Sequence, residues 1–74
     1  MSIWTQVKET GNFVTEASDL QANPLLRICP NCKKPVGKRK RDFTSYVEHR
    51  DEEHEVTHWE VIHPCGAHLI IFND

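Results

Sequence analysis

The sequence has few of the features on which a small secreted protein relies for stability. Only three cysteines occur among its 74 residues, and an odd number of thiols cannot pair off within one chain. A disulfide scaffold is therefore a poor explanation of its fold. A chain of this length also buries too little apolar surface to outweigh its conformational entropy comfortably. We expect a bound metal ion to supply the missing stability.

Long apolar runs and glycine-rich loops are also absent. The longest purely aliphatic or aromatic run is Leu69 to Phe72, and the first residues lack the apolar region of a secretory signal. These absences predict a cytoplasmic protein without a membrane partner. The three glycines form no phosphate-binding loop, and no Ser/His/Asp arrangement stands out. We therefore expect a protein that is not an enzyme and has no small-molecule substrate. We also expect the protein to be a monomer.

Charge is distributed unevenly along the chain. The formal net charge is -2, but six of the nine Lys and Arg residues lie between Lys33 and Arg41, where no acidic residue occurs. Six of the eleven acidic residues lie between Glu48 and Glu60. Such local clusters set the field that a partner feels within a Debye length of about 8 Å. The sequence therefore predicts one basic and one acidic surface.

The apolar pattern favours β-structure. Gly11-Asn12 separates two apolar pieces and predicts a hairpin turn, while residues 41–49 and 56–63 alternate as half-buried strands do. In the first strand we expect Phe43, Ser45 and Val47 to share the face that covers the core, with Tyr46 on the other face. The expected core comprises Trp4, Phe13, Trp59, Val61, Leu69, Ile71 and part of segment 25–28.

The ligand chemistry begins at Cys29. Cys29-Pro-Asn-Cys32 and Cys65-Gly-Ala-His68 both place two ligand-type residues two positions apart, the spacing at which a tight turn brings both side chains to one ion. We predict one structural Zn²⁺ bound by Cys29, Cys32, Cys65 and His68. His63 is the alternative fourth ligand, followed by an external or other ligand. We expect His49, His54 and His58 to be solvated, with a second metal ion bound to them as the alternative. A redox role for the first pair is disfavoured, because turn residues and not a helix follow Cys32.

These two knuckles, joined by a long hairpin and followed by an apolar strand, resemble a zinc ribbon over residues 29–73. The resemblance implies a mainly β fold, with a three-stranded antiparallel ribbon at 29–74. It leaves residues 1–28 unmatched, and the turn pattern at Gly11-Asn12 predicts that they form an N-terminal β-hairpin extension packed on the ribbon as one folded unit. The departure is His68, because most ribbons have a fourth cysteine there.

Zinc ribbons occur in transcription factors, RNA polymerase subunits and small phage or bacterial regulators, nearly always as binding modules. The resemblance therefore implies a regulatory protein that contacts nucleic acid or a nucleic-acid-handling machine such as RNA polymerase. The small size is that of a bacterial or phage accessory protein.

The basic segment is the expected nucleic-acid surface. Lys38, Arg39, Lys40 and Arg41 would neutralise phosphates, and Tyr46 would stack on a base. The plain alternative is an edge strand whose charges prevent sheet-to-sheet aggregation.

The acidic hairpin tip, Glu48 to Glu55, suggests a second function. A protein-binding adaptor or inhibitor could present Asp51, Glu52 and Glu53 to a basic surface, where charge complementarity orients docking. The segment Arg50-Asp-Glu-Glu53 also resembles, more weakly, the ribbon tip of the transcript-cleavage elongation factor. That likeness implies that Asp51 and Glu52 help to hold a metal ion in a polymerase active site.

Overall fold

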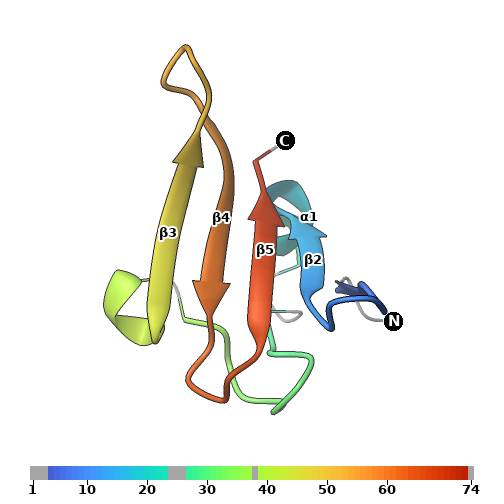
Figure 1. Cartoon of the computed structure of the whole chain (residues 1–74). Helices are drawn as coiled ribbons and strands as arrows, with labels where there is room; N and C mark the ends of the chain where they lie inside the picture. Colours follow the sequence, from blue (N-terminus) through green and yellow to red (C-terminus); the bar gives the residue numbers. More distant parts are fainter. Residues whose placement is uncertain (1–3, 24–26, 38, 74) are drawn as a thin grey trace.

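The computed structural model describes residues 4–23, 27–37 and 39–73, and its fold is mainly β (Figure 1). A single sheet has the strand order β1-β2-β5-β4-β3. The prediction of a small, mainly β domain is confirmed. The strands are β1 (Thr5–Gln6), β2 (Phe13–Glu16), β3 (Ser45–Arg50), β4 (Val56–Ile62) and β5 (His68–Phe72), and the helices are α1 (Ala17–Ala22) and the 3-10 helix η2 (Lys40–Asp42).

The sheet is mixed. Strands β3, β4 and β5 pair antiparallel in sequence order, and β1 pairs antiparallel with β2. The turn between β1 and β2 contains Gly11 at φ 77°, a backbone conformation that glycine adopts without steric cost. Strand β2 then pairs parallel with β5, with Phe13 beside Leu69. The first hairpin therefore extends the same sheet as the later strands.

The core lies on one face of the sheet. Val61 on β4 and Leu69 on β5 are its centre, with exposed fractions of 1% and 0%. Trp4, Leu20 of α1 and Val36 are also buried, while the predicted core residues Phe13, Trp59 and Ile71 are half-buried against them. Within the predicted segment 25–28, Ile28 is 38% exposed, contrary to expectation, and Leu25 and Leu26 lie outside the described residues.

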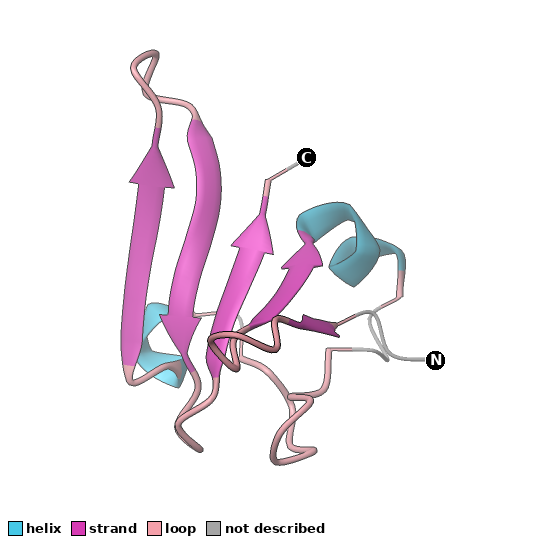
Figure 2. Ribbon diagram, turned by 45° about the vertical axis from the view of Figure 1, so that its right-hand side comes forward, coloured by secondary structure: helices cyan, strands magenta, loops and turns pink. Residues whose placement is uncertain are grey.

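The opposite face of β3, β4 and β5 is uncovered. In Figure 1 no described segment crosses the front of these strands, and in Figure 2 η2 lies behind β3 and β4. Val47 on this face is 46% exposed, and Phe72 is 43% exposed. The expectation that Val47 faces the core is wrong, because η2 ends only at Asp42 and the regular alternation of the strand begins at Ser45, so Phe43 is not in phase with Val47. Tyr46 consequently packs against the core.

Candidate metal centre

Two turns bring the cysteine-containing segments together at one end of the sheet. In the first turn the backbone N–H of Lys33 donates to the carbonyl oxygen of Cys29 at 3.0 Å, and Cys29 N–H donates to Lys34 O at 2.8 Å. The second turn joins β4 to β5, where Gly66 N–H donates to His63 O at 2.7 Å. Gly66 has φ 96°, so this turn needs a residue that tolerates the left-handed region.

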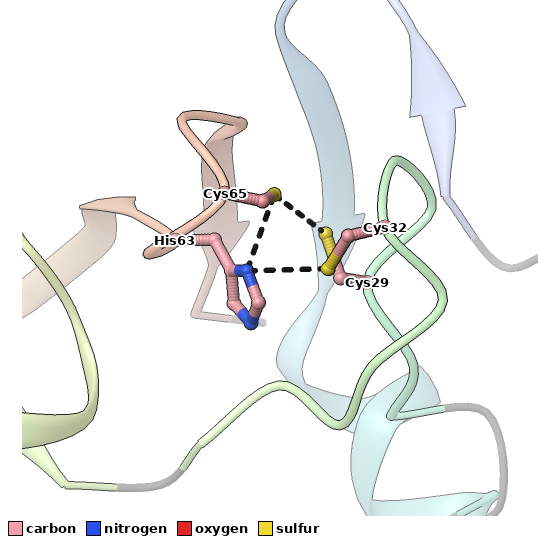
Figure 3. A group of neighbouring side chains, drawn as sticks. All are labelled: Cys29, Cys32, His63 and Cys65. Atoms are coloured by element: carbon pink, nitrogen blue, oxygen red, sulfur yellow. Dashed lines mark hydrogen bonds between the residues drawn. The ribbon is translucent and has the colours of Figure 1, made fainter.

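The two turns present three thiols and one imidazole to a common point (Figure 3). Cys29 Sγ lies 3.6 Å from Cys65 Sγ. Nδ1 of His63 lies 3.3 Å from Cys65 Sγ and 3.6 Å from Cys32 Sγ. All four ligand atoms lie within 4.8 Å of one another. Because a disulfide needs a sulfur–sulfur distance of about 2.05 Å, all three cysteines are free thiols.

The orientation of the His63 ring is fixed from its other side. Its Nε2 lies 3.2 Å from the backbone carbonyl oxygen of Pro35, and the residue is only 5% exposed. A carbonyl oxygen can only accept a hydrogen bond, so Nε2 carries the proton. In the neutral ring Nδ1 then has a free electron pair directed at the sulfur atoms. This is the tautomer that a metal ligand requires.

The fourth member of the cluster is His63 and not His68. Val61 on β4 and His63, which directly follows β4, are buried on the core side of the sheet, while Ile62 between them points to the uncovered side. Ile62 is the register partner of His68, so His68 lies on the uncovered face and is exposed. The structure therefore brings His63, and not the predicted His68, together with the three cysteines. The two-residue spacing after Cys65 was misleading, because His68 already belongs to strand β5.

The environment of the thiols favours the ligand form of Cys65. The Nδ2 group of Asn31 donates to Cys65 Sγ at 3.4 Å, and this hydrogen bond is the main cause that lowers the pKa of Cys65 to about 6. Burial raises the pKa of Cys29 above its usual value. The lowered pKa of Cys65 favours the thiolate, the form that binds metal ions.

The basic segment is ordered around η2. Arg39, Lys40 and Arg41 are exposed, while Lys38 lies outside the described residues. The carboxylate of Asp42 accepts a hydrogen bond from the backbone N–H of Arg39 at 2.9 Å and so closes the short helix. Gly37 lies directly against the Asp42 side chain, where no Cβ would fit. The three arginine and lysine side chains therefore project from a locally fixed backbone.

Tyr46 lies beside an aromatic pocket on the core side of the sheet. Its ring centroid is 5.9 Å from that of Phe43. Both residues line a partly open pocket of about 170 Å³, together with Trp59 and Arg27. Tyr46 is half-buried, so any base that stacks on it must enter from this pocket and not from the uncovered face.

The acidic residues at the β3–β4 tip have different roles. Oδ1 of Asp51 accepts hydrogen bonds from the backbone N–H groups of Glu53 and Glu55 at 2.8 and 3.0 Å, so Asp51 holds the loop. Arg50 donates to Glu48 Oε2 at 2.9 Å and to His54 O at 2.6 Å. The side chains of Glu52 and Glu53 are exposed.

A second cluster contains two histidines that the sequence predicts to be solvated, with a bound metal ion as the alternative. His49, His58 and Glu60 hold their ligand-type atoms within 4.8 Å of one another on the uncovered face. The signal that could have found them is the strand pairing, because a cross-strand register places His49 opposite His58.

Comparison with protein-family models, with curated proteins and with solved structures found no match for this chain. Within the part of the chain that the structure describes, neither helix is long and apolar enough to cross a membrane. The candidate functions therefore rest on the residues and their geometry.

Proposed function

We propose that the chain is a small zinc-binding module in which Cys29, Cys32, His63 and Cys65 hold one structural Zn²⁺. The observation that carries the proposal is the convergence of three thiols and one correctly oriented imidazole nitrogen on one point. Thiolate sulfur and imidazole nitrogen are the ligands that zinc prefers in structural sites. The Pro35 carbonyl that orients His63 is the outer hydrogen-bond partner that zinc-bound histidines usually have.

The distances fit a tetrahedral ion. Bonds of about 2.3 Å to sulfur and about 2.0 Å to nitrogen require the ligand atoms to lie roughly 3.5 to 3.8 Å apart. His63 Nδ1 lies 3.3 Å from Cys65 Sγ and 3.6 Å from Cys32 Sγ, and the sulfur atoms of Cys29 and Cys65 lie 3.6 Å apart. Four protein ligands would fill the coordination shell, so the ion would have no open position for a substrate or water. This favours a structural role over a catalytic one.

A structural ion at this site would stabilise the small fold. Cys29 is fully buried beside the core, and Ala67 of the second turn is 7% exposed, so the site is continuous with the small hydrophobic core. Zinc in comparable small sites contributes on the order of 10 to 16 kcal/mol of apparent binding free energy at neutral pH. That amount exceeds the typical net stability of a small domain.

The function that we propose for the module is binding of nucleic acid, or of a nucleic-acid-handling protein, through the basic segment and the adjacent pocket. Support comes from three exposed cations, with Arg39 directly before η2 and Lys40 and Arg41 on it. Further support comes from the pocket lined by Phe43, Tyr46 and Trp59, because Gly37 and Phe43, which both line it, flank the basic segment in the chain. Cations neutralise phosphates, and aromatic rings stack on bases that are not paired. Single-stranded nucleic acid is the partner that this combination favours.

The test is a titration of fluorescent single-stranded DNA and RNA oligonucleotides with the zinc-loaded protein at several salt concentrations. We expect the triple variant Arg39→Ala, Lys40→Ala, Arg41→Ala to lower affinity and to reduce the salt slope by about 2, since each lost phosphate contact removes about 0.7. The matched control is Glu52→Ala with Glu53→Ala, which removes exposed charges at the acidic tip. Equal affinity of all three proteins would overturn the proposal.

A second candidate is a protein-binding adaptor that acts through the acidic tip. The observation that favours it is the β3–β4 loop, which projects beyond the other strands in Figure 1 and carries the exposed Glu52 and Glu53. Affinity purification of the tagged protein, with and without nuclease, separates the two candidates. A protein partner that survives nuclease and is lost in the Glu52/Glu53 variant supports the adaptor.

A further inference from the structure

The uncovered face of the sheet carries three metal-ligand side chains in register. His49 on β3 is the direct cross-strand partner of His58 on β4. Glu60 lies two residues further along β4, so it shares a face with His58. The two imidazole rings stack with centroids 4.2 Å apart and planes 10° from parallel. Nε2 of His49 lies 3.5 Å from Oε1 of Glu60.

One atom of this cluster has an unusual environment. Nε2 of His49 is buried and has no hydrogen-bond partner among the described residues, although a carboxylate oxygen of Glu60 lies within ion-pair distance of it. A buried nitrogen without a hydrogen bond is an unfavourable arrangement in a folded protein. An ion placed between His49 Nε2, a His58 nitrogen and Glu60 would give that nitrogen a partner. The three ligand-type atoms lie within 4.8 Å of one another, close enough to bind one ion after small side-chain rotations.

We propose that His49, His58 and Glu60 form a second metal site, which takes a transition-metal ion of the Zn²⁺ type. Imidazole nitrogen suits zinc, copper, nickel and iron, whereas calcium and magnesium take oxygen ligands. Two histidines and one carboxylate are also a set that zinc uses where it keeps a position for a further ligand. The site is therefore chemically distinct from the cysteine cluster, which offers three sulfur atoms.

The second site is separate in space from the cysteine cluster. His63 points to the core side of the sheet, whereas His58 and Glu60 lie on the uncovered side. The five residue steps of extended chain from His58 to His63 correspond to roughly 16 Å. Binding at the second site requires at least one of the stacked rings to turn, because nitrogens in parallel planes do not point to a common centre. We therefore expect this ion to bind more weakly than the ion at the cysteine cluster.

The experiment is a Zn²⁺ titration of the whole protein, followed by calorimetry and by NMR of the histidine ring nitrogens. We expect a second, weaker equivalent that shifts the ring signals of His49 and His58. The informative variants are His58→Phe, which keeps a ring to stack on His49 and to contact Phe72 but has no ligand nitrogen, and Glu60→Gln. We expect His58→Phe to weaken the second equivalent at least 10-fold and Glu60→Gln to weaken it several-fold.

Matched controls distinguish this site from general binding of zinc to surface histidines. His54→Phe removes an exposed imidazole of the hairpin loop, and His68→Phe removes one from the same face. We expect both variants to keep the second equivalent. The proposal is overturned if added Zn²⁺ leaves the ring signals of His49 and His58 unchanged, or if all three histidine variants weaken the binding that these signals report alike. Because the NMR signals report on His49 and His58 directly, the result does not depend on whether the cysteine cluster holds zinc.

Discussion

Nε2 of His63 lies 3.2 Å from the carbonyl oxygen of Pro35 and therefore points away from the cysteines, while Nδ1 points toward them. The first prediction follows from this relationship. His63→Ala should lose zinc, with an affinity at least about 100-fold lower, because a ligand is removed and not merely an outer partner. His68→Ala should retain wild-type affinity. Competition with a chromophoric chelator measures both.

A rescue variant makes this prediction sharper. His63→Cys restores a fourth ligand of a type that structural zinc sites accept, so it should recover most of the lost affinity. Zinc loss in His68→Ala with retention in His63→Ala would instead assign the fourth position to His68.

The sequence alone predicted three of the four members of this cluster. The two C-x2-type spacings identify turns, and turns bring ligands together whatever sheet surrounds them. The fourth member depends on which face of the sheet each histidine occupies. The sequence predicts part of this, because Val61 and His63 share a face by alternation. The pairing of Ile62 with His68 depends on the tertiary structure, and the sequence alone does not show it.

The fold shows the same division between local and long-range information. The hairpin at Gly11 follows from turn chemistry, and β4 follows from alternation. The parallel pairing of β2 with β5 joins residues more than fifty positions apart, and no local pattern encodes it. Tyr46 was assigned to the wrong side because η2 interrupts the extended chain before Ser45.

The second prediction concerns removal of zinc. A strong chelator should unfold the protein at 25 °C, because the apparent binding energy of about 10 to 16 kcal/mol exceeds the stability that so small a core supplies. Loss of the β signal in circular dichroism measures this, and added Zn²⁺ should restore it. Mg²⁺ serves as the control and should not restore it, since it requires oxygen ligands. A folded chain with less than about half an equivalent of zinc would contradict the structural role.

The third prediction concerns Asn31, whose side chain donates to Cys65 Sγ. Asn31→Ala should raise the pKa of Cys65 and lower zinc affinity by about 10- to 100-fold, the usual effect of removing an outer hydrogen bond to a metal ligand. The control is Asn73→Ala, because that amide donates to the carbonyl oxygen of Val56, away from the cluster. Chelator competition at pH 7 should separate the two variants. Equal affinities would show that the Asn31 hydrogen bond does not support the thiolate.

The fourth prediction separates structure from recognition at the acidic tip. Asp51→Ala removes the acceptor of two loop N–H groups and should lower the free energy of unfolding of the zinc-loaded protein by about 1 kcal/mol, as loss of a capping side chain does. Asp51→Asn keeps a side-chain oxygen and should lower the free energy of unfolding by only a few tenths of that amount. Glu52→Ala, at an exposed position of the same loop, should leave stability unchanged. Urea unfolding measures all three. If Asp51→Ala is as stable as Glu52→Ala, the Asp51 carboxylate does not hold the loop, and its charge is available to a partner in the same way as that of Glu52.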